Sequence, residues 1–223
     1  SIGGVGGETD TTVDGSEKFC SALRQLVCSV ADGAGVKSQV KVTGTDGEVF
    51  SGLGAWRGGE GENYIFGFIR FEQVPRIDPD RFDEVTVEFP ITGHVYDVRE
   101  KRYLGLTNRI QTRIIRGDAR LFAILKDKIS EVSLVLPETV KLGENLILDF
   151  SAGSGSQVFR LELCDPSGVL HPGYSRVIAV PSGKGAAKFQ IAFNHPPGSW
   201  KAVAVNIASG LRCEKMVNVL KNE

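Results

Sequence analysis

The sequence predicts a mostly β protein: two antiparallel β-sandwich domains, the second immunoglobulin-like, with one helix at the N-terminus. Three observations predict this. Apolar residues recur at helical spacing only near the start of the chain, short alternating runs fill the rest, and turn signals separate these runs. Because apolar residues make up 41% of the 223 residues, the chain has enough material for real cores.

The first 36 residues contain the only helical pattern. Residues 1–15, "SIGGVGGETDTTVDG", are rich in Gly, Thr and Asp and predict a flexible arm. Residues 16–36 predict a helix that Ser16 can cap and that Gly33 or Gly35 ends. Its apolar stripe consists of Phe19, Leu23, Leu26, Val27 and Val30. Such a stripe must be buried, so we interpret the helix as the end of a neighbouring domain or a strut to it.

Residues 37–125 predict the first antiparallel β-domain. Short β-type runs such as "DEVTVEF", "HVYDV", "RYLGL" and "RIQTRII" are separated by turn signals, Thr92-Gly93 among them. The polar turn "REKR", between Val98 and Tyr103, fits a hairpin. The stretch "AGSGSQ" further along lacks the last glycine of a nucleophile elbow, and we interpret it as a flexible hairpin loop.

Residues 129–220 predict the second domain, an immunoglobulin-like sandwich of about seven strands. In "QVFRLELC" the alternation places Phe159, Leu161 and Leu163 inward. In "AAKFQIAF" the same alternation predicts three further inward residues, Phe189, Ile191 and Phe193.

The charge balance limits the possible partners. The net charge of −1 gives no general attraction to nucleic acid, and no apolar run approaches the ~18 residues of a membrane helix, so we expect neither nucleic-acid binding nor membrane insertion. The segment from Arg99 to Lys128, however, contains nine Lys and Arg residues and only three Asp and Glu residues. This excess indicates either a solvated sheet face or a patch that docks an acidic partner or an anionic glycan. Ser1, in place of a methionine, indicates a processed or excised chain.

No motif in the sequence specifies a reaction, so we predict no catalytic residue, no metal site and no cofactor. The three histidines fall in or beside turns without metal-ligand spacing. Cys164 and Cys213 fall on separate expected strands, so a disulfide between them stays open. Tyr174, Trp56 and Tyr64 are candidate carbohydrate-binding residues, because a flat aromatic face covers the apolar face of a sugar ring; core or rim packing is the alternative.

Several motifs, read in order, resemble a known enzyme family. The segments "AWRGGEGENYIFGFIR", "HVYDVREKRYLG" and "RGDARLFAIL" resemble the C-terminal region of bacterial beta-galactosidase-like glycoside hydrolases, the group with a catalytic barrel, a trimerisation domain and a small β-domain. The segments "LELCDPSGVLHPGYSRVIAV" and "FNHPPGSWKAVAVNIASG" resemble an added immunoglobulin-type module in which Trp200 is a sandwich residue. The barrel that carries the catalytic glutamates in that family has no counterpart here.

The resemblance implies a non-catalytic, structural accessory region of a larger bacterial carbohydrate-active enzyme, one that braces or oligomerises the catalytic part. Its expected partners are the catalytic domain of the parent protein and, as a possibility, polysaccharide or a second copy of the chain. A secreted or periplasmic location is favoured over a cytoplasmic one. Two alternatives stay open: a carbohydrate-binding module, and a cell-surface protein-interaction or adhesion module.

Overall fold

A computed structural model describes part of the chain. The described residues are 22–23, 25–27, 29–31, 33–35, 40–50, 53–59, 63–70 and 80–221. The chain divides into two compact units, Ser1–Gln39 and Val40–Glu223. Described residues between 22 and 33 are helical, as the sequence predicts. The expected arm at 1–15, Cys20 and Cys28 lie outside the described residues.

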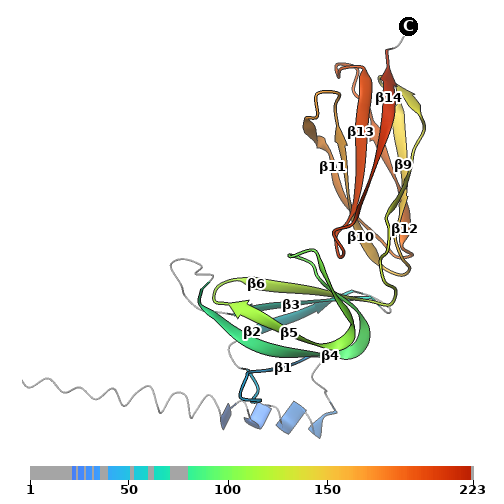
Figure 1. Ribbon diagram of the computed structural model, residues 1–223. Helices are drawn as coiled ribbons and strands as arrows, with labels where there is room; N and C mark the ends of the chain where they lie inside the picture. Colours follow the sequence, from blue (N-terminus) through green and yellow to red (C-terminus); the bar gives the residue numbers. More distant parts are fainter. Residues whose placement is uncertain are drawn as a thin grey trace, which may run out of the picture. The chain divides into compact units, whose positions relative to one another are not determined.

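The described chain is mostly β and its strands are mostly antiparallel, which confirms the prediction of a mostly β, sandwich-type fold (Figure 1). The first six strands are β1 Lys41–Thr43, β2 Leu53–Gly58, β3 Tyr64–Arg70, β4 Phe82–Asp97, β5 Arg102–Ile115 and β6 Ala119–Leu125. The following eight are β7 Ser133–Val135, β8 Thr139–Lys141, β9 Asn145–Ser151, β10 Gln157–Cys164, β11 Leu170–Val180, β12 Lys184–Gln190, β13 Gly198–Asn206 and β14 Arg212–Leu220.

Strands β1 to β6 form one six-stranded sheet that folds onto itself. Its order is β1-β4-β6-β3-β2, and β5 pairs with the other edge of β4. The sixteen-residue β4 belongs to both halves, because its first part pairs with β1 and its last part with β6. The register between β4 and β5 shifts between Glu88 and Gly93, and β4 curves at this point (Figure 1). The first sandwich is therefore made from a single sheet.

Because β4 and β5 run through the bend, the turn expected at Thr92-Gly93 is wrong. The runs on either side of it belong to one strand, and "RYLGL" and "RIQTRII" likewise form one strand, β5. Gly93 is needed there for close packing: a Cβ at this position would lie 2.6 Å from the Ile124 side chain and 3.0 Å from the Leu125 carbonyl oxygen. The glycine thus marks where two strands approach each other within a sheet.

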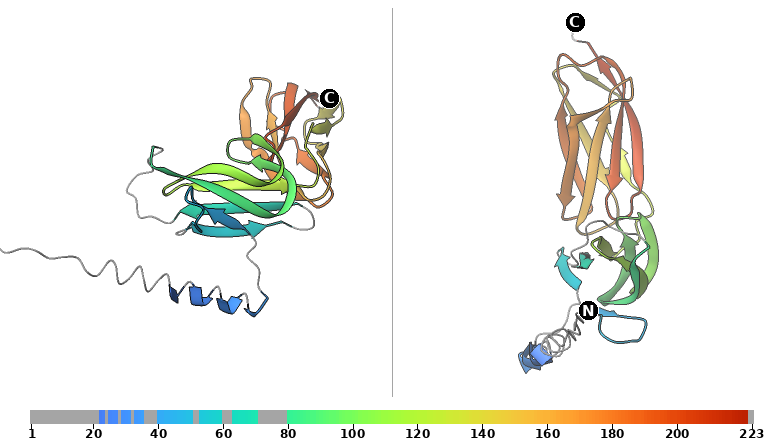
Figure 2. Two further views of the ribbon diagram at one scale, coloured as in Figure 1. Left: turned by 60° about the horizontal axis from the view of Figure 1, so that its bottom comes forward. Right: turned by 90° about the vertical axis from the view of Figure 1, so that its left-hand side faces the viewer.

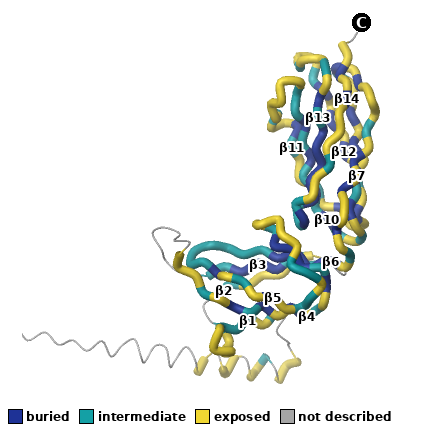
Figure 3. Tube along the Cα trace, in the orientation of Figure 1, coloured by how far each residue is buried: buried dark blue, intermediate teal, exposed yellow. Residues whose placement is uncertain are grey.

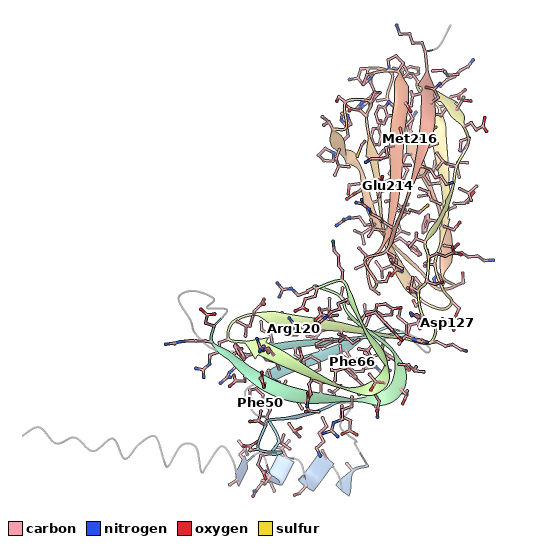
Figure 4. The ribbon with its side chains drawn as sticks, in the orientation of Figure 1. Phe50, Phe66, Arg120, Asp127, Glu214 and Met216 are labelled. Atoms are coloured by element: carbon pink, nitrogen blue, oxygen red, sulfur yellow. The ribbon has the colours of Figure 1, made fainter. Side chains whose placement is uncertain are left out.

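Aromatic and aliphatic residues from the two halves of the folded sheet form its core. Phe66 of β3, labelled in Figure 4, is 1% exposed, and its ring centroid lies 5.3 Å from that of Phe89 in β4. Phe89 also packs edge-on against Phe122 of β6, at 6.1 Å. The other members of this core are Phe68, Val85, Val87, Val95, Ile110, Ile114 and Ile124.

Strands β7 to β14 form the second sandwich from two separate sheets. One sheet has the order β12-β9-β7 and the other β11-β10-β13-β14-β8, and the two layers are visible in Figure 2. Only β8 and β14 pair in parallel among these described strands. Phe159, Leu161 and Leu163 are fully buried, as predicted. Buried and less buried residues alternate along strands of this sandwich (Figure 3). Trp200 of β13 is also fully buried, as the resemblance implies for a sandwich residue.

One inward prediction in this sandwich is wrong. Phe189 and Ile191 are fully buried, but Phe193 is 71% exposed. The alternation breaks because β12 ends at Gln190, and the backbone of Ile191 then bonds to Gly143 and Glu144 in a tight loop. Beyond Ile191 the chain no longer has the period of two that places alternate side chains inward.

The contrast between Phe189 and Phe193 predicts different costs of truncation. We expect Phe189→Ala to lower the free energy of unfolding by about 3–5 kcal/mol, because it opens a cavity in the second core. The matched control Phe193→Ala removes the same ring from an exposed position and should stay within about 0.5 kcal/mol of the parent. Urea unfolding monitored by circular dichroism measures both, and equal costs would contradict the assignment of Phe193 to the surface.

Candidate functional site

A buried polar side chain, that of Asn63, joins the two β-sandwiches. Asn63 directly precedes β3 and is 4% exposed. Its side-chain amide nitrogen donates to the carbonyl oxygens of Ser154 and Ser156, at 3.0 and 2.9 Å. Its side-chain oxygen accepts the backbone N–H of Lys126 at 2.9 Å. One buried amide therefore connects the first sheet, the connecting segment and a loop of the second sandwich. We call this contact between the two sandwiches the joint.

Apolar contacts continue across the joint. Tyr96, Ala123 and Leu125 of the first sheet belong to the same buried cluster as the core of the second sandwich. The Tyr96 hydroxyl accepts the backbone N–H of Ile129 at 2.8 Å, so this buried ring also has its polar end satisfied. Burial raises the pKa of the Tyr96 hydroxyl above its usual range.

The loop "AGSGSQ" is the part of the second sandwich that the joint requires. Gly155 has a φ of +65°, and a Cβ there would lie 2.8 Å from the Asn63 amide nitrogen. The Ser154 hydroxyl bonds to the carboxylate of Asp127, which is labelled in Figure 4. The glycine at 155 thus permits both the left-handed turn and the close approach of Asn63. The loop is a docking element, where the sequence alone indicated only a flexible connection.

The charged motif "YDVREKR…GDAR" forms an ion pair inside the first sandwich. Asp97 is fully buried, and one of its oxygens accepts the backbone N–H groups of Arg99 and Glu100 at 3.1 and 3.0 Å. Its other oxygen pairs with Arg120, whose side chain is 11% exposed and also bonds Glu100 at 2.8 Å. That hydrogen bond from Arg120 lowers the pKa of Glu100. The pattern therefore fastens the β4–β5 hairpin to β6, and Figure 4 labels Arg120.

Two histidines that are distant in sequence meet in the second sandwich. His171 and His195 have ring centroids 4.6 Å apart, and the His171 ring stacks on Trp200 at 5.7 Å. A ring nitrogen of His171 lies 2.9 Å from a carboxylate oxygen of Asp165. The hydroxyl of Ser167 and then His171 hold the pKa of Asp165 well below its usual range. Sequence spacing gave no sign of this histidine–aromatic cluster, because three strands and their loops supply it.

The polar side chains of the histidine–aromatic cluster bond to neighbouring residues of the second sandwich. No group of three His, Cys, Asp or Glu residues within the described part of the chain is placed to hold a metal ion. The polar members are instead engaged with neighbours: Asp165 accepts hydrogen bonds from Ser167 and Val169, and the Trp200 indole donates to the Pro196 carbonyl at 2.9 Å. Those bonds close the turn at Pro166–Gly168 and fix the loop before β13.

The three candidate carbohydrate-binding residues lie apart. Tyr174 is 8% exposed, its ring packs against Trp200 and His195, and its hydroxyl accepts the N–H of Ala192 at 3.0 Å. Its ring therefore offers no open face, which corrects its assignment as a stacking residue. Tyr64 is half-buried beneath the guanidinium of Arg57, 4.1 Å from the ring centroid.

Trp56 is the one candidate with an open ring. It is 53% exposed on β2, directly opposite Gly67 of β3. A Cβ at Gly67 would lie 2.0–2.4 Å from three atoms of the indole, so the ring lies over the glycine with its other face outward. Arg57 and Phe66 are the next opposed pair, and Phe66 points into the core with Tyr64. Trp56 and Tyr64 thus occupy opposite faces of the sheet and cannot form one platform.

Two open grooves, of about 500 and 520 Å³, flank the turn at 44–47. Arg109, Gln111 and Arg113 of β5 line the first, together with Glu84 and Thr86 of β4. The second is lined by Phe50, labelled in Figure 4, and by an ion pair between Arg70 and Asp83. Basic, acidic and hydroxyl side chains line the first groove, and the second adds the apolar residues Val49 and Phe82.

Cys164 and Cys213 are both free. They face opposite sides of the same sheet, because Cys164 is opposed by half-exposed Lys201 whereas Cys213 is opposed by fully buried Ala204. The disulfide that the sequence left open is therefore not formed. No helix within the described part of the chain has the length and apolarity that a membrane span requires.

Comparison with known proteins gives only distant likenesses. No family model and no curated protein matches the chain. A superoxide reductase (neelaredoxin) from Ignicoccus hospitalis aligns with 41% of this chain and 82% of its own, at 13% identity and a TM-score of 0.32. A putative membrane anchored protein from Corynebacterium diphtheriae aligns with 82% of this chain and 57% of its own, at 10% identity and a TM-score of 0.32. Likenesses at this level assign no function.

The lowered pKa of Asp165 predicts an acid-sensitive contribution to stability. A folded-state pKa below the unfolded one contributes stability that is fully present above the usual aspartate pKa, about 4, and lost as pH falls through the folded value. We expect Asp165→Asn to lower the free energy of unfolding by the same amount at pH 7 and pH 6. The difference in unfolding free energy between the variant and the parent should shrink below a pH of about 4.

Urea unfolding between pH 7 and pH 3 measures this difference. The control Asp149→Asn removes an exposed carboxylate of β9 for which no ion pair is found among the described residues, and its effect should be small throughout. A difference between Asp165→Asn and the parent that grows on acidification would contradict the assigned role of Asp165.

Proposed function

We propose that this chain is a non-catalytic accessory region of a larger bacterial carbohydrate-active enzyme, in which two coupled β-sandwiches brace the catalytic part. The observation that carries the proposal is the joint. Asn63, Tyr96 and the loop at 152–156 bond the two sandwiches directly, and one apolar cluster runs from one into the other. A spacer must keep its length and direction under thermal motion, and an apolar, hydrogen-bonded contact between domains limits their relative motion.

The contacts that the charged side chains of these motifs make support the same role. Asp97, Glu100 and Arg120 lie in the segments whose resemblance suggests a glycoside hydrolase parent, and all three are engaged with one another. The carboxylates of Asp97 and Glu100 are thus committed to internal contacts. We assign the parent enzyme, its catalytic domain as partner and its export from the cytoplasm on that resemblance.

We also propose that the second sandwich is immunoglobulin-like. Support comes from its topology: β7 pairs within the three-stranded sheet, whereas β8, the next segment, pairs in parallel with β14 in the other sheet. A first strand divided between both sheets, with the last strand beside its second part, is the arrangement of many immunoglobulin-type domains. The buried tryptophan lies on β13, and no disulfide links the sheets, so the core differs in detail from antibody domains.

The bracing role predicts that the two sandwiches tumble together in solution. We expect ¹⁵N relaxation to give equal rotational correlation times for residues 82–115 and 145–190. Combining Asn63→Ala with Tyr96→Phe removes the hydrogen bonds that these two side chains make across the joint and leaves their buried partners unsatisfied, at a cost of about 1–3 kcal/mol per group. The two correlation times should then diverge while both sandwiches stay folded.

The matched control is Asn145→Ala, which changes an exposed asparagine at the start of β9 and should leave tumbling unchanged. Independent tumbling of the two sandwiches in the parent chain would contradict the bracing role. Turnover of a chromogenic glycoside by the purified chain would overturn the non-catalytic assignment.

The open ring of Trp56 favours a second candidate function, weak binding of polysaccharide. The indole rests on Gly67 and presents its outer face, the geometry that sugar stacking needs. Affinity electrophoresis in gels containing plant or bacterial polysaccharides should show retardation that Trp56→Ala abolishes. Tyr103→Ala, which removes an aromatic residue of similar exposure (37%), is the control. Equal mobility in every gel, with and without Trp56, would reject this function.

A further inference from the structure

The longest uncovered strand edge of the described chain belongs to β5. Among the described residues this fourteen-residue strand pairs with β4 alone. Strand β4, by contrast, has neighbours on both of its edges, β5 on one and β1 or β6 on the other. A strand with one open edge presents backbone donors and acceptors that can pair with another chain.

The hydrogen bonds of β1 show which backbone groups of β4 face β5. The carbonyl oxygen of Val42 in β1 accepts the N–H of Phe50 at 2.9 Å, on the side away from β4. In an antiparallel sheet the backbone groups of successive residues point to opposite edges. Lys41 and Thr43, the neighbours of Val42, therefore direct their backbone N–H and C=O groups toward β4. The backbone groups of their partners there, Glu88 and Thr86, face β1 in return.

The alternation continues through β4 into β5. Because the backbone groups of Thr86 and Glu88 face β1, those of the alternate residues Val85 and Val87 face β5. Their partners in β5, Thr112 and Ile110, therefore direct their backbone groups back to β4. Gln111 and Arg113 alternate with those partners, so their backbone N–H and C=O groups point to the open edge.

Thr107 gives independent support for this orientation. Its hydroxyl donates to the carbonyl oxygen of Arg109 and accepts the N–H of Arg109, both at 2.9 Å. The backbone N–H and C=O groups of Arg109 are therefore turned away from β4. By the same alternation, the backbone groups of Gln111 and Arg113 are also turned away from β4. The threonine also caps the open stretch at one end, leaving Gln111 and Arg113 as its centre.

The other long edge is closed to a partner. Strand β11 contains Pro172, which removes a donor, and its register with β10 shifts between Glu162 and Cys164. The guanidinium of Arg176 then reaches across to the Lys188 carbonyl of β12 at 2.9 Å, covering the edge. The edge strands β1, β7 and β8 are three residues long. These devices are ones that proteins use against unwanted pairing. The centre of β5 contains no proline, and no strand within the described ranges pairs with its open edge.

Side chains define what the open edge accepts. Arg109, Gln111 and Arg113 are exposed on the outer face and line a groove of about 500 Å³. No acidic residue occurs anywhere in β5. On its covered side, Glu84 and Glu88 of β4 lie opposite the two arginines, and Glu84 bonds Arg113 at 3.4 Å. An incoming strand with carboxylates at the same two positions would pair with the same arginines from the open side.

A second copy of this chain does not fit. Two β5 edges paired antiparallel would place arginines beside arginines with no carboxylate between them, which is unfavourable. The acidic strand β4 of a second copy is already paired on both edges. An anionic glycan would satisfy the arginines but has no backbone N–H and C=O groups in strand register.

We propose that the edge of β5 from Arg109 to Arg113 is a strand-addition site for an extended acidic segment of a partner protein. The segment pairs with the open backbone groups of Gln111 and Arg113 and places alternate carboxylates beside the two arginines. Its intervening residues are β-branched or apolar, because they continue the row of Ile110 and Ile114 that faces the first core.

The chain itself supplies a probe, the acetylated and amidated peptide Glu-Val-Thr-Val-Glu-Phe, which copies residues 84–89. Fluorescence anisotropy of the labelled peptide with the full chain at low salt should show saturable binding. Arg109→Gln combined with Arg113→Gln should weaken binding about tenfold, since two cross-strand charge pairs are lost. The control Arg212→Gln alters an arginine on β14 whose side chain is 69% exposed, and binding should be unchanged.

Two further measurements separate strand addition from charge attraction. A peptide of the same charge with proline in place of its threonine should not bind, and the parent peptide should slow amide hydrogen exchange at Gln111 and Arg113. Equal binding of the proline peptide or of an anionic polysaccharide, unchanged exchange at those amides, or no binding of the parent peptide would overturn the proposal. So would a dimer of the chain that the Gln111→Pro variant abolishes.

Discussion

The continuity of β4 is the constraint on which the rest of the described structure depends. The sheet folds onto itself because one strand, β4, continues through the bend over Phe82–Asp97 and pairs with β5 on both sides of an irregularity between Glu88 and Gly93. Its first part builds one layer of the first core and leaves β5 at the edge. Its last residues, Tyr96 and Asp97, then supply the contact to the second sandwich and the buried carboxylate of the hairpin. One strand thus connects the core, the ion pair and the joint.

Buried polar groups mark the places where the fold is specified rather than only stabilised. Asp97, Asn63 and Asn206 are nearly or fully inaccessible to solvent, and each makes at least one hydrogen bond to a residue distant in sequence. An apolar contact tolerates small shifts, whereas a buried amide or carboxylate that loses its partner leaves an unsatisfied group costing about 1–3 kcal/mol or more. These residues therefore fix the register of the hairpin and the position of the joint.

Binding and bracing use different parts of the molecule. The polar side chains of the joint and of the ion pair are buried and bonded mainly to one another, so they present little to a ligand. The β5 edge and the outer face of Trp56 retain open backbone groups and an open ring. Both lie on the first sandwich, whereas the aromatic and histidine side chains around Trp200 serve the packing of the second.

The sequence by itself determined the β class, the helix and most inward positions, because the period of side-chain direction is local: Phe159, Leu161 and Leu163 follow from alternation alone. It could not determine that Thr92-Gly93 is a bend, that Phe193 leaves the core or that Tyr174 is covered, since each depends on which strands become neighbours. The role of Asn63 and the open edge of β5 were equally hidden. Pairing brings together residues about 90 positions apart, as Asn63 and Ser154 show, and only the tertiary structure decides such pairs.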